Sequence, residues 1–236
     1  MPIKALILAG GLGTRLRPVL PGRAKPLAPI GDKVFIEILI EALLRQKIAK
    51  IILSIGYQAP TFINYFQNKS YYKKLEFITE ERPLGTGGAI KYALQQLKLI
   101  DQEMILVLNG DSFVQFNLAN FLSPLNSNWA RILLRKVPDT GRYGMVKIKA
   151  DKVTHFAEKS QNGPGLINAG IYLLKGQFFK SLNFTTEQFS WENDVLAKFC
   201  HLERFTYQLT EGFFIDIGTP QDYQKLQANP KLINYE

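Results

Sequence analysis

Short apolar runs alternate with amphipathic helical segments along the first 111 residues of this chain. Two segments, at 34–46 and roughly 87–98, repeat apolar residues at helical spacing. Four apolar runs have the length and composition of buried β-strands: 3–8, 51–55, 75–79 and 104–109. Strands that alternate with helices predict an α/β fold, with a mostly parallel sheet and helices on both faces.

The second half of the chain has a different pattern. Strand-like segments follow one another with few helices between them, so we expect a mixed-sheet extension that packs on the first half. No Pro/Ser-rich linker, internal repeat or low-complexity stretch separates the halves, which predicts a single domain over 1–236 with two lobes. The expected strands are 132–137, 145–150, 152–158, 167–174, 204–209 and 212–218, and the expected helices are 190–200 and 219–227.

The cysteine count and the hydropathy limit the class of protein. Cys200 is the only cysteine, which excludes an internal disulfide and a cysteine-based zinc site, and we expect a buried structural thiol. No apolar run approaches about 20 residues, so no membrane-spanning helix is expected. The N-terminus lacks the regions of a signal peptide. We therefore expect a cytoplasmic protein that does not bind a membrane; an assembly of identical subunits stays open.

Positive charge is concentrated at the start of the chain. The whole chain carries a net charge of +9, and the basic residues Arg15, Arg17, Arg23 and Lys25 crowd around one glycine-rich segment. Basic charge attracts either nucleic acid or a small polyanion. No helix-turn-helix, zinc finger or RNA-binding aromatic signature accompanies it, so a nucleoside triphosphate is the favoured partner and nucleic acid is not.

The glycine-rich segment LILAGGLGTRLRPVLPGRAKPL, residues 6–27, is the most informative motif. Glycines let the backbone turn sharply and leave N–H groups free to bind phosphate oxygens. Two common phosphate-binding motifs do not match: Leu16 stands where the dinucleotide fingerprint needs a third glycine, and G-T-R stands where a P-loop has G-K-[ST]. A tight surface turn is the alternative, but the arginine and the Lys-Pro-Leu that follow favour phosphate binding.

This segment resembles the signature of the sugar-1-phosphate nucleotidyltransferases, G-G-x-G-T-R-L-x-P followed by P-K-P-[LM]. Further similarities are PLGTGGAI at 83–90, NGD at 109–111, RYG at 142–144, EK at 158–159, GLINAGIYLL at 165–174 and FIDIGTPQDY at 214–223. The last two, with FSWENDVL, most resemble the D-glycero-α-D-manno-heptose 1-phosphate guanylyltransferases. One departure is Ala24, where the family usually has proline before the lysine; its loss could loosen the loop that carries Lys25.

The resemblance implies a Rossmann-like three-layer, GT-A-like fold with a central mixed, mostly parallel sheet. Its nucleotide-binding half would be about 1–115 and its sugar-phosphate-binding half about 116–236. It also implies transfer of a nucleoside monophosphate, GMP from GTP in the favoured case, to a sugar 1-phosphate. The heptose derivative is the favoured acceptor, and the GDP-heptose formed would feed surface-glycan synthesis.

The resemblance implies a role for each charged residue of the motifs. Arg15 would hold the leaving pyrophosphate, and Lys25 would bridge the reacting phosphates. Asp111 and Asp216 would together hold Mg²⁺, because hard carboxylate oxygens suit that ion. A turn or helix cap is the alternative role for each aspartate taken alone.

The remaining candidate residues belong to the two substrates. Glu80 follows a predicted strand, and its carboxylate could accept hydrogen bonds from both N1–H and N2 of guanine. Two alternatives stay open: Glu80 could bind the amino group of cytosine, or it could be a solvated glutamate that contacts no base. Glu192 is a further sugar candidate or a helix-start acid. The nucleotide-binding candidates are Ala9, Gly10, Gly11, Gly13, Thr14, Arg15, Glu80, Gly85, Thr86 and Asn109; the sugar-phosphate candidates are Gly144, Glu158, Lys159, Asn168 and Gly170.

Three other functions are compatible with the sequence. The first keeps the enzyme class but uses mannose or glucose 1-phosphate with GTP, UTP or CTP. The second is a non-catalytic nucleotide-sugar-binding regulatory subunit, against which the intact charged residues argue. The third is a metal-dependent glycosyltransferase, which would need an Asp-x-Asp motif where NGDS at 109–112 supplies one acid.

Overall fold

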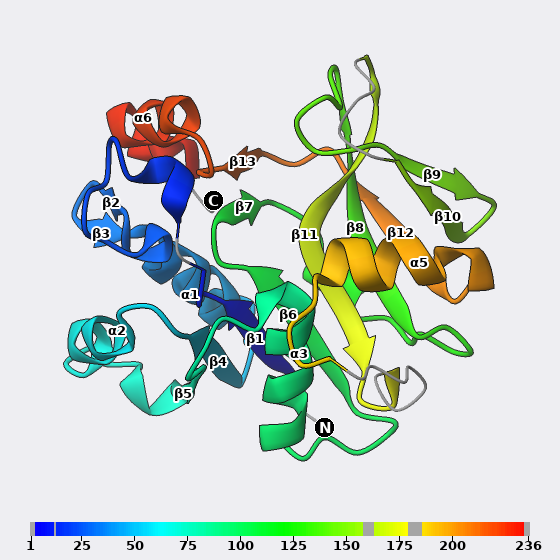
Figure 1. The fold of residues 1–236 in the computed structure, drawn as a ribbon, viewed down its shortest axis with the longest axis horizontal. Coiled ribbons are helices and arrows are strands. Elements are labelled where there is room, and N and C mark those ends of the chain that lie inside the picture. The colour runs from blue at the N-terminus through cyan, green and yellow to red at the C-terminus, as the bar shows by residue number, and fades with distance from the viewer. Residues whose placement is uncertain (1–2, 12, 158–162, 179–185, 234–236) are drawn as a thin grey trace. The chain divides into compact units, whose positions relative to one another are not determined.

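The structure, a computed structural model, describes residues 3–11, 13–157, 163–178 and 186–233 (Figure 1). The chain forms two units that interleave along the sequence. Unit 1 comprises Met1–Pro83, Leu108–Val114 and Phe213–Glu236, and unit 2 comprises Leu84–Val107 and Gln115–Gly212. The halves expected from the sequence are contiguous, whereas these units are not. The organisation as one domain with two lobes stays a prediction.

Unit 1 contains a parallel sheet in the order β5-β4-β1 (Figure 1). All three strands were expected from their apolar runs. The central residues of β1 and β4 are fully buried, whereas β5 buries Leu75 and Ile78 and leaves Phe77 half-buried. The strands of the unit are β1 (Lys4–Leu8), β2 (Pro29–Ile30), β3 (Lys33–Val34), β4 (Lys50–Ile55), β5 (Leu75–Thr79), β7 (Ser112–Val114) and β13 (Phe214–Asp216). Its helices are α1 (Phe35–Arg45), α2 (Ala59–Phe66) and α6 (Pro220–Ala228), with 3₁₀ turns at Thr14–Leu16, Lys25–Leu27, Tyr72–Lys74 and Pro230–Ile233.

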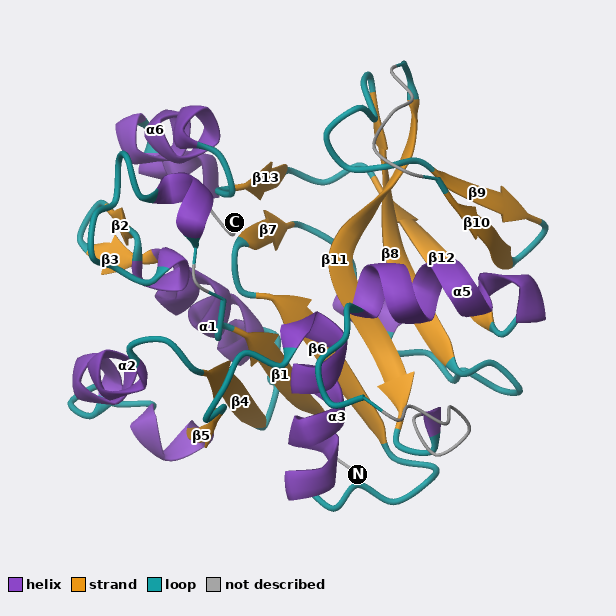
Figure 2. Ribbon diagram, in the orientation of Figure 1, coloured by secondary structure: helices purple, strands orange, loops and turns teal. Residues whose placement is uncertain are grey.

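Unit 2 contains a sheet in the order β6-β11-β8-β12-β10-β9, whose strands are drawn in orange in Figure 2. The β8–β12 pair is parallel, while β8–β11, β9–β10 and β10–β12 are antiparallel, so this sheet is mixed as expected. Its strands are β6 (Met104–Asn109, which crosses into unit 1), β8 (Ala130–Val137), β9 (Val146–Lys149), β10 (Lys152–Phe156), β11 (Gly165–Lys175) and β12 (Phe205–Thr210). Its helices are α3 (Gly85–Gln96), α4 (Leu118–Phe121), a π-helical turn Trp191–Leu196, α5 (Ala197–Phe199) and a 3₁₀ turn Cys200–Leu202.

A buried carboxylate in unit 1 connects α1 with α2 and the segment that follows α2. Glu37 is 2% exposed and accepts hydrogen bonds from the hydroxyls of Tyr65 (2.5 Å) and Tyr71 (2.8 Å). Lys69 pairs with the same carboxylate at 2.5 Å. Burial raises the pKa of Glu37, but the hydrogen bonds from Lys69 and the two tyrosines outweigh it, and the pKa is lowered. The carboxylate is therefore charged and fully partnered.

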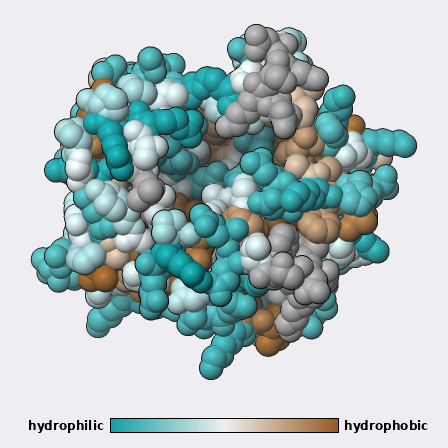
Figure 3. All heavy atoms as spheres, in the orientation of Figure 1, coloured by the Kyte–Doolittle hydropathy of each residue, from teal (hydrophilic) through white to brown (hydrophobic). Residues whose placement is uncertain are grey.

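Few large apolar side chains are exposed among the described residues. The large apolar side chains that are exposed are Tyr57, Ile100, Leu202 and Leu209. Hydrophilic residues predominate over the described part of the face drawn in Figure 3. Cys200 is buried, as expected, and burial raises the pKa of its thiol. No described helix has the length and hydropathy needed to span a bilayer.

Candidate active site

The glycine-rich turn brings the backbone of residue 13 against Lys25. Gly13 lies between β1 and the 3₁₀ turn Thr14–Leu16 and has a left-handed φ of 58°. A Cβ at this position would lie 2.9 Å from the Cβ of Lys25, which is closer than side-chain carbons approach. Glycine is therefore required here both for the conformation and for the close approach.

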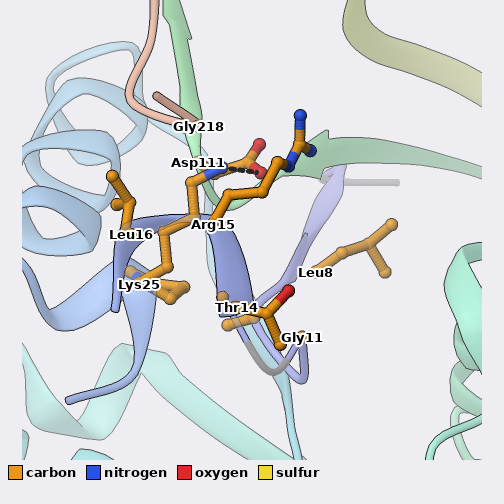
Figure 4. Close-up of a pocket in the computed structure, with 11 residues that line it drawn as sticks. Leu8, Gly11, Thr14, Arg15, Leu16, Lys25, Asp111 and Gly218 are labelled. Atoms are coloured by element: carbon orange, nitrogen blue, oxygen red, sulfur yellow. Dashed lines mark hydrogen bonds and ion pairs between the residues drawn. The ribbon is translucent and has the colours of Figure 1, made fainter. Parts of the chain in front are cut away.

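Lys25 places its ammonium between the two aspartates that the sequence singled out. Its side chain is 9% exposed, and its Nζ lies 2.6 Å from Oδ2 of Asp111 and 3.6 Å from Oδ1 of Asp216. Figure 4 shows the pair between Lys25 and Asp111 beside the glycine-rich turn. A buried ammonium needs opposite charge close by, and these two carboxylates supply it.

The β7–β13 pair brings the two aspartates together from distant parts of the chain. Asp216 stands opposite Ser112 in this antiparallel pair, next to Asp111. The backbone N–H of Ile217 donates to the carbonyl of Asp111 (3.0 Å), and that of Gly218 donates to Oδ1 of Asp216 (2.7 Å). A Cβ at Gly218 would lie 2.9 Å from Nζ of Lys25 and 2.7 Å from Oδ1 of Asp216, so a side chain here would displace these charged groups from their present positions.

Lys25, Asp111 and Gly218 line a pocket of about 180 Å³ whose lining residues all belong to unit 1. Arg15 is exposed at the pocket, and no interaction joins it to the other residues drawn in Figure 4. Two cations thus line one cavity beside a glycine-rich backbone, which suits an anionic ligand with several oxygens. The lining residues are Leu8, Ala9, Gly11, Gly13, Thr14, Arg15, Leu16, Lys25, Pro26, Asp111 and Gly218.

The donor set at Asp111 and Asp216 fits Mg²⁺. Among the described residues no group of three or more His, Cys, Asp or Glu side chains could hold a metal ion. Mg²⁺ nevertheless binds well through one or two carboxylates, with water and substrate phosphates completing its coordination. Two carboxylates near one ammonium carry a net negative charge, and a divalent cation would reverse its sign. The residues present therefore suit this ion better than a fully protein-coordinated one such as structural zinc.

Glu80 lies at the same end of the parallel sheet as the glycine-rich turn. Its backbone N–H donates to the carbonyl of Ile55 (2.7 Å), and its Oε1 accepts from the hydroxyl of Ser54 (2.8 Å). A Cβ at Gly10 would lie 2.6 Å from that same Oε1. The absence of a side chain at Gly10 therefore lets the Glu80 carboxylate lie against the turn. Ser54 is fully buried, which fixes its hydroxyl in place.

The PLGTGG motif is held in unit 2 by the segment that precedes the π-helical turn. Cβ atoms at Gly85 and Gly88 would lie 2.6 Å and 2.2 Å from the carbonyl oxygens of Phe189 and Glu187, and one at Gly87 would meet the Phe189 ring at 2.4 Å. These glycines are thus explained by backbone packing, a role that the sequence did not reveal.

Thr86 has its hydroxyl engaged within the protein. It accepts from the backbone N–H of Trp191 (2.8 Å) and donates to Oε2 of Glu192 (2.7 Å), which also accepts from Ser190 (3.2 Å). The nucleotide-binding role of Gly85 and Thr86 stays a prediction. The contacts instead link Thr86 with Glu192, the additional sugar candidate.

The described sugar-side candidates, Asn168, Gly170 and Gly144, lie in a strand and a turn of unit 2. Asn168 accepts from the N–H of Gly170 (3.0 Å) and donates to the hydroxyl of Tyr172 (2.7 Å), across an irregularity in β11 at which Gly170 has a φ of 77°. Gly144 has a φ of 79° and donates its N–H to the carbonyl of Thr140 (3.1 Å).

Two predicted residues, Glu158 and Lys159, lie outside the described residues. The remaining nucleotide candidate, Asn109, ends β6 in unit 1. Its Oδ1 is buried and accepts no hydrogen bond from the described residues. An acceptor in this state is available to a ligand donor or an ordered water.

The sequence pattern of the family described as Nucleotidyl transferase matches residues 4–232 of the chain. The chain is a member of this family. Two curated relatives agree with the assignment, and both are D-glycero-α-D-manno-heptose 1-phosphate guanylyltransferases. The enzyme from Campylobacter jejuni is 38% identical, over 96% of this chain and 100% of that protein. The enzyme from Aneurinibacillus thermoaerophilus is 36% identical, over 95% of this chain and 97% of that protein.

A solved structure supports the same assignment. The crystal structure of HddC from Yersinia pseudotuberculosis matches this nucleotidyltransferase with a TM-score of 0.85 and 36% identity, over 97% of this chain and 100% of that chain. Another structure of HddC, complexed with GMP-PN, gives a TM-score of 0.84. The resemblance found in the sequence is therefore confirmed, as are the α/β fold with a mixed sheet and the enzyme class.

Three residues of the nucleotidyltransferase site escaped the sequence reasoning. Ser54 carried a signal, because a serine inside the apolar run IILSI is a polar group in a buried strand. Gly218 closes the FIDIG motif, but the need for a residue without a side chain at this position is visible only in the structure, where Lys25 and Asp216 both lie close to it. Gln58 carried no signal; its side chain contacts residues 22 and 24, far away in the sequence.

Proposed function

We propose that this nucleotidyltransferase transfers GMP from GTP to D-glycero-α-D-manno-heptose 1-phosphate, forming GDP-heptose and pyrophosphate. The observation that carries the proposal is the pocket of unit 1, in which Arg15, Lys25 and Asp111 meet beside the glycine-rich turn and Asp216 approaches Lys25. The substrates are inferred from the two relatives and from the guanine nucleotide analogue named in the HddC complex.

The reaction needs charge compensation more than proton transfer. An oxygen of the sugar 1-phosphate attacks the α-phosphorus of GTP, and the bond from that phosphorus to the bridging oxygen of pyrophosphate breaks. The attacking phosphate is already anionic near neutral pH, so no general base is required. The barrier comes mainly from repulsion between two polyanions and from charge that builds up on the leaving group.

Arg15 and Lys25 have separate tasks in this scheme. The planar guanidinium of Arg15 binds oxygens of the leaving pyrophosphate in a bidentate manner. Lys25, fixed by Asp111 and Asp216, holds a point charge close to the reacting phosphates. Free N–H groups of the glycine-rich turn would bind further phosphate oxygens.

Asp111 and Asp216 are the residues that would hold Mg²⁺. When bound, this ion neutralises phosphate charge and polarises the phosphoryl oxygens. Arg15 and Lys25 offset the charges of the two aspartates, so the divalent cation would leave the site positive toward a triphosphate. Such a balance favours a metal-bound nucleotide over a free sugar phosphate as the first ligand of this pocket.

Glu80 is the residue that would select guanine. A carboxylate accepts from both N1–H and the N2 amino group of guanine, whereas uracil presents one donor flanked by acceptors. The hydroxyl of Ser54 holds one carboxylate oxygen in position at the end of the sheet. The sugar phosphate would be bound by Glu158, Lys159, Asn168, Gly170 and the backbone of Gly144, and Gly85, Thr86 and Asn109 would complete the nucleotide site.

A panel of substrates tests the proposal. Pyrophosphate release is measured with GTP, CTP, UTP and dTTP, each combined with heptose, mannose and glucose 1-phosphates in the presence of Mg²⁺. We expect the fastest release with GTP and D-glycero-α-D-manno-heptose 1-phosphate, and loss of release after chelation of the metal. Faster turnover of mannose 1-phosphate would overturn the heptose assignment, and no release with any pair would leave a nucleotide-sugar-binding subunit.

A further inference from the structure

We infer that Gln58 is a positioning residue for Lys25, acting through the backbone of residues 22–24; the inference rests on the proposed function of Lys25. The Oε1 atom of Gln58 accepts a hydrogen bond from the backbone N–H of Ala24 (2.8 Å), and its Nε2 donates to the carbonyl of Gly22 (2.5 Å). One side chain thus binds alternate residues of the segment that leads directly into Lys25.

The backbone at Ala24 explains why this segment needs such a partner. Ala24 is fully buried and has a φ of −65°, the value to which a proline ring would lock this position. Alanine has no ring to enforce that angle, so the conformation must be held by contacts. Ala24 does, however, keep the N–H group that proline lacks, and this is the group that Gln58 binds.

Lys25 depends on this conformation for its direction. Ala24 immediately precedes the 3₁₀ turn Lys25–Leu27, and the carbonyl of Ala24 accepts the N–H of Leu27 (2.9 Å). A rotation at Ala24 would therefore move the whole turn, and with it the ammonium that lies 2.6 Å from Asp111. On the other side, Lys25 packs close to Gly13, where an added Cβ would lie 2.9 Å from the Cβ of Lys25.

Gln58 is itself fixed by the fold of unit 1. It follows β4 and stands at the start of α2 with a left-handed φ of 63°, which is unusual for a residue with a Cβ. Its carbonyl accepts the N–H of Thr61 (2.9 Å), and α2 is anchored by the fully buried Phe62 and Phe66. The sheet and α2 thus fix the position of the Gln58 side chain, which in turn binds residues 22 and 24.

Paired substitutions test the inference. Gln58→Met keeps the length of the side chain but removes both hydrogen bonds, and Gln67→Met is the matched control at the exposed other end of α2. We expect Gln58→Met to lower kcat by about tenfold to hundredfold, because small displacements of catalytic groups have effects of this size. The KM for the nucleotide should change much less, since Arg15 and the glycine-rich turn are retained. Gln67→Met should leave both constants unchanged.

Ala24→Pro separates positioning from a general loss of structure. The ring fixes φ near its present value and removes the N–H that Gln58 binds. Turnover in the Ala24→Pro background should therefore become nearly independent of Gln58, so that adding Gln58→Met costs less than about threefold. An equal loss in both backgrounds would show that Gln58 acts elsewhere, and would overturn the inference.

Hydrogen–deuterium exchange gives a readout that needs no substrate. In the free protein, Gln58→Met should speed exchange across residues 22–28 while β1 and β5 stay protected as in the wild type. Unchanged exchange in that segment, or faster exchange with wild-type kcat, would refute the link between Gln58 and Lys25. Should Ala24→Pro fail to fold, the exchange rates and kcat of Gln58→Met and the wild type still decide whether Gln58 positions Lys25. A wild-type protein inactive toward every substrate pair would contradict the proposed function, and the exchange experiment would still test the segment.

Discussion

Replacing Gly13 by alanine should separate the conformational cost of this residue from its effect on Lys25. Gly13 and Gly31 both have left-handed backbones, with φ values of 58° and 62°. A Cβ at Gly13 would lie 2.9 Å from the Cβ of Lys25, whereas one at Gly31 would lie 3.6 Å from Pro230, an ordinary contact. Gly31→Ala is therefore a matched control, with the same conformational cost and no collision.

The expected magnitudes follow from these two contacts. An alanine in the left-handed region costs about 1–2 kcal/mol, partly offset by about 0.4–1 kcal/mol from the stiffer unfolded chain. Both variants should thus unfold a few degrees below the wild type, since 1 kcal/mol corresponds to about 2–4 °C for a chain of this size. Only Gly13→Ala must also displace Lys25, by roughly half an ångström, and we expect kcat to fall roughly tenfold.

Thermal unfolding and steady-state pyrophosphate release measure the two effects separately. The reasoning requires similar melting temperatures for Gly13→Ala and Gly31→Ala, together with a kcat that falls only in the former. Equal kcat values for the two variants would refute the claim that the close approach of Gly13 sets the position of Lys25. A much lower melting temperature for Gly13→Ala alone would show that the turn cannot relax around the new methyl group.

Three further changes test other parts of the site and the fold. Asp111→Asn should lower turnover by about a thousandfold or more while the protein still folds, and near wild-type turnover would remove Asp111 from the metal site. Glu80→Gln should shift nucleotide preference from GTP toward UTP or dTTP in the substrate panel; retained GTP preference would show that another residue reads the base. Glu37→Gln should destabilise the fold by about 2–3 kcal/mol near neutral pH, against at most about 1 kcal/mol for the more exposed control Glu41→Gln. Folding lowers the pKa of Glu37, so the charged carboxylate stabilises the fold above the ordinary glutamate pKa, and this stabilisation fades as the pH falls. The difference in unfolding free energy between the wild type and Glu37→Gln should therefore shrink when urea unfolding is measured at acidic pH.

The strands were predictable because their signal is local. The apolar runs at 75–79 and 104–109 coincide with β5 and β6, and the helix expected at 34–46 is α1, Phe35–Arg45. In α2 the aromatic residues Phe62 and Phe66 recur at helical spacing, and both are fully buried. Apolar periodicity reports which face of an element is buried, and this is decided within a few residues of sequence.

The sequence named residues that the structure brings together, but it predicted only part of their contacts. Motif similarity selected Arg15, Lys25, Asp111 and Asp216, and the structure brings Lys25 to both aspartates. Motif similarity could not reveal that Lys25 lies between the two aspartates, or that Gln58 binds the backbone of residues 22 and 24. Such contacts join residues far apart in sequence, and neither hydropathy nor spacing records them.

The split of unit 1 along the chain has a consequence for biosynthesis. Lys25 and the glycine-rich turn leave the ribosome first, but Asp216 and Gly218 reach them only after all of unit 2 has been made. Nascent chains that stop before β13 lack one of the two carboxylates that hold the ammonium, as well as the strand partner of β7. Prematurely terminated chains should therefore be unable to consume nucleotide, however well their earlier strands have folded.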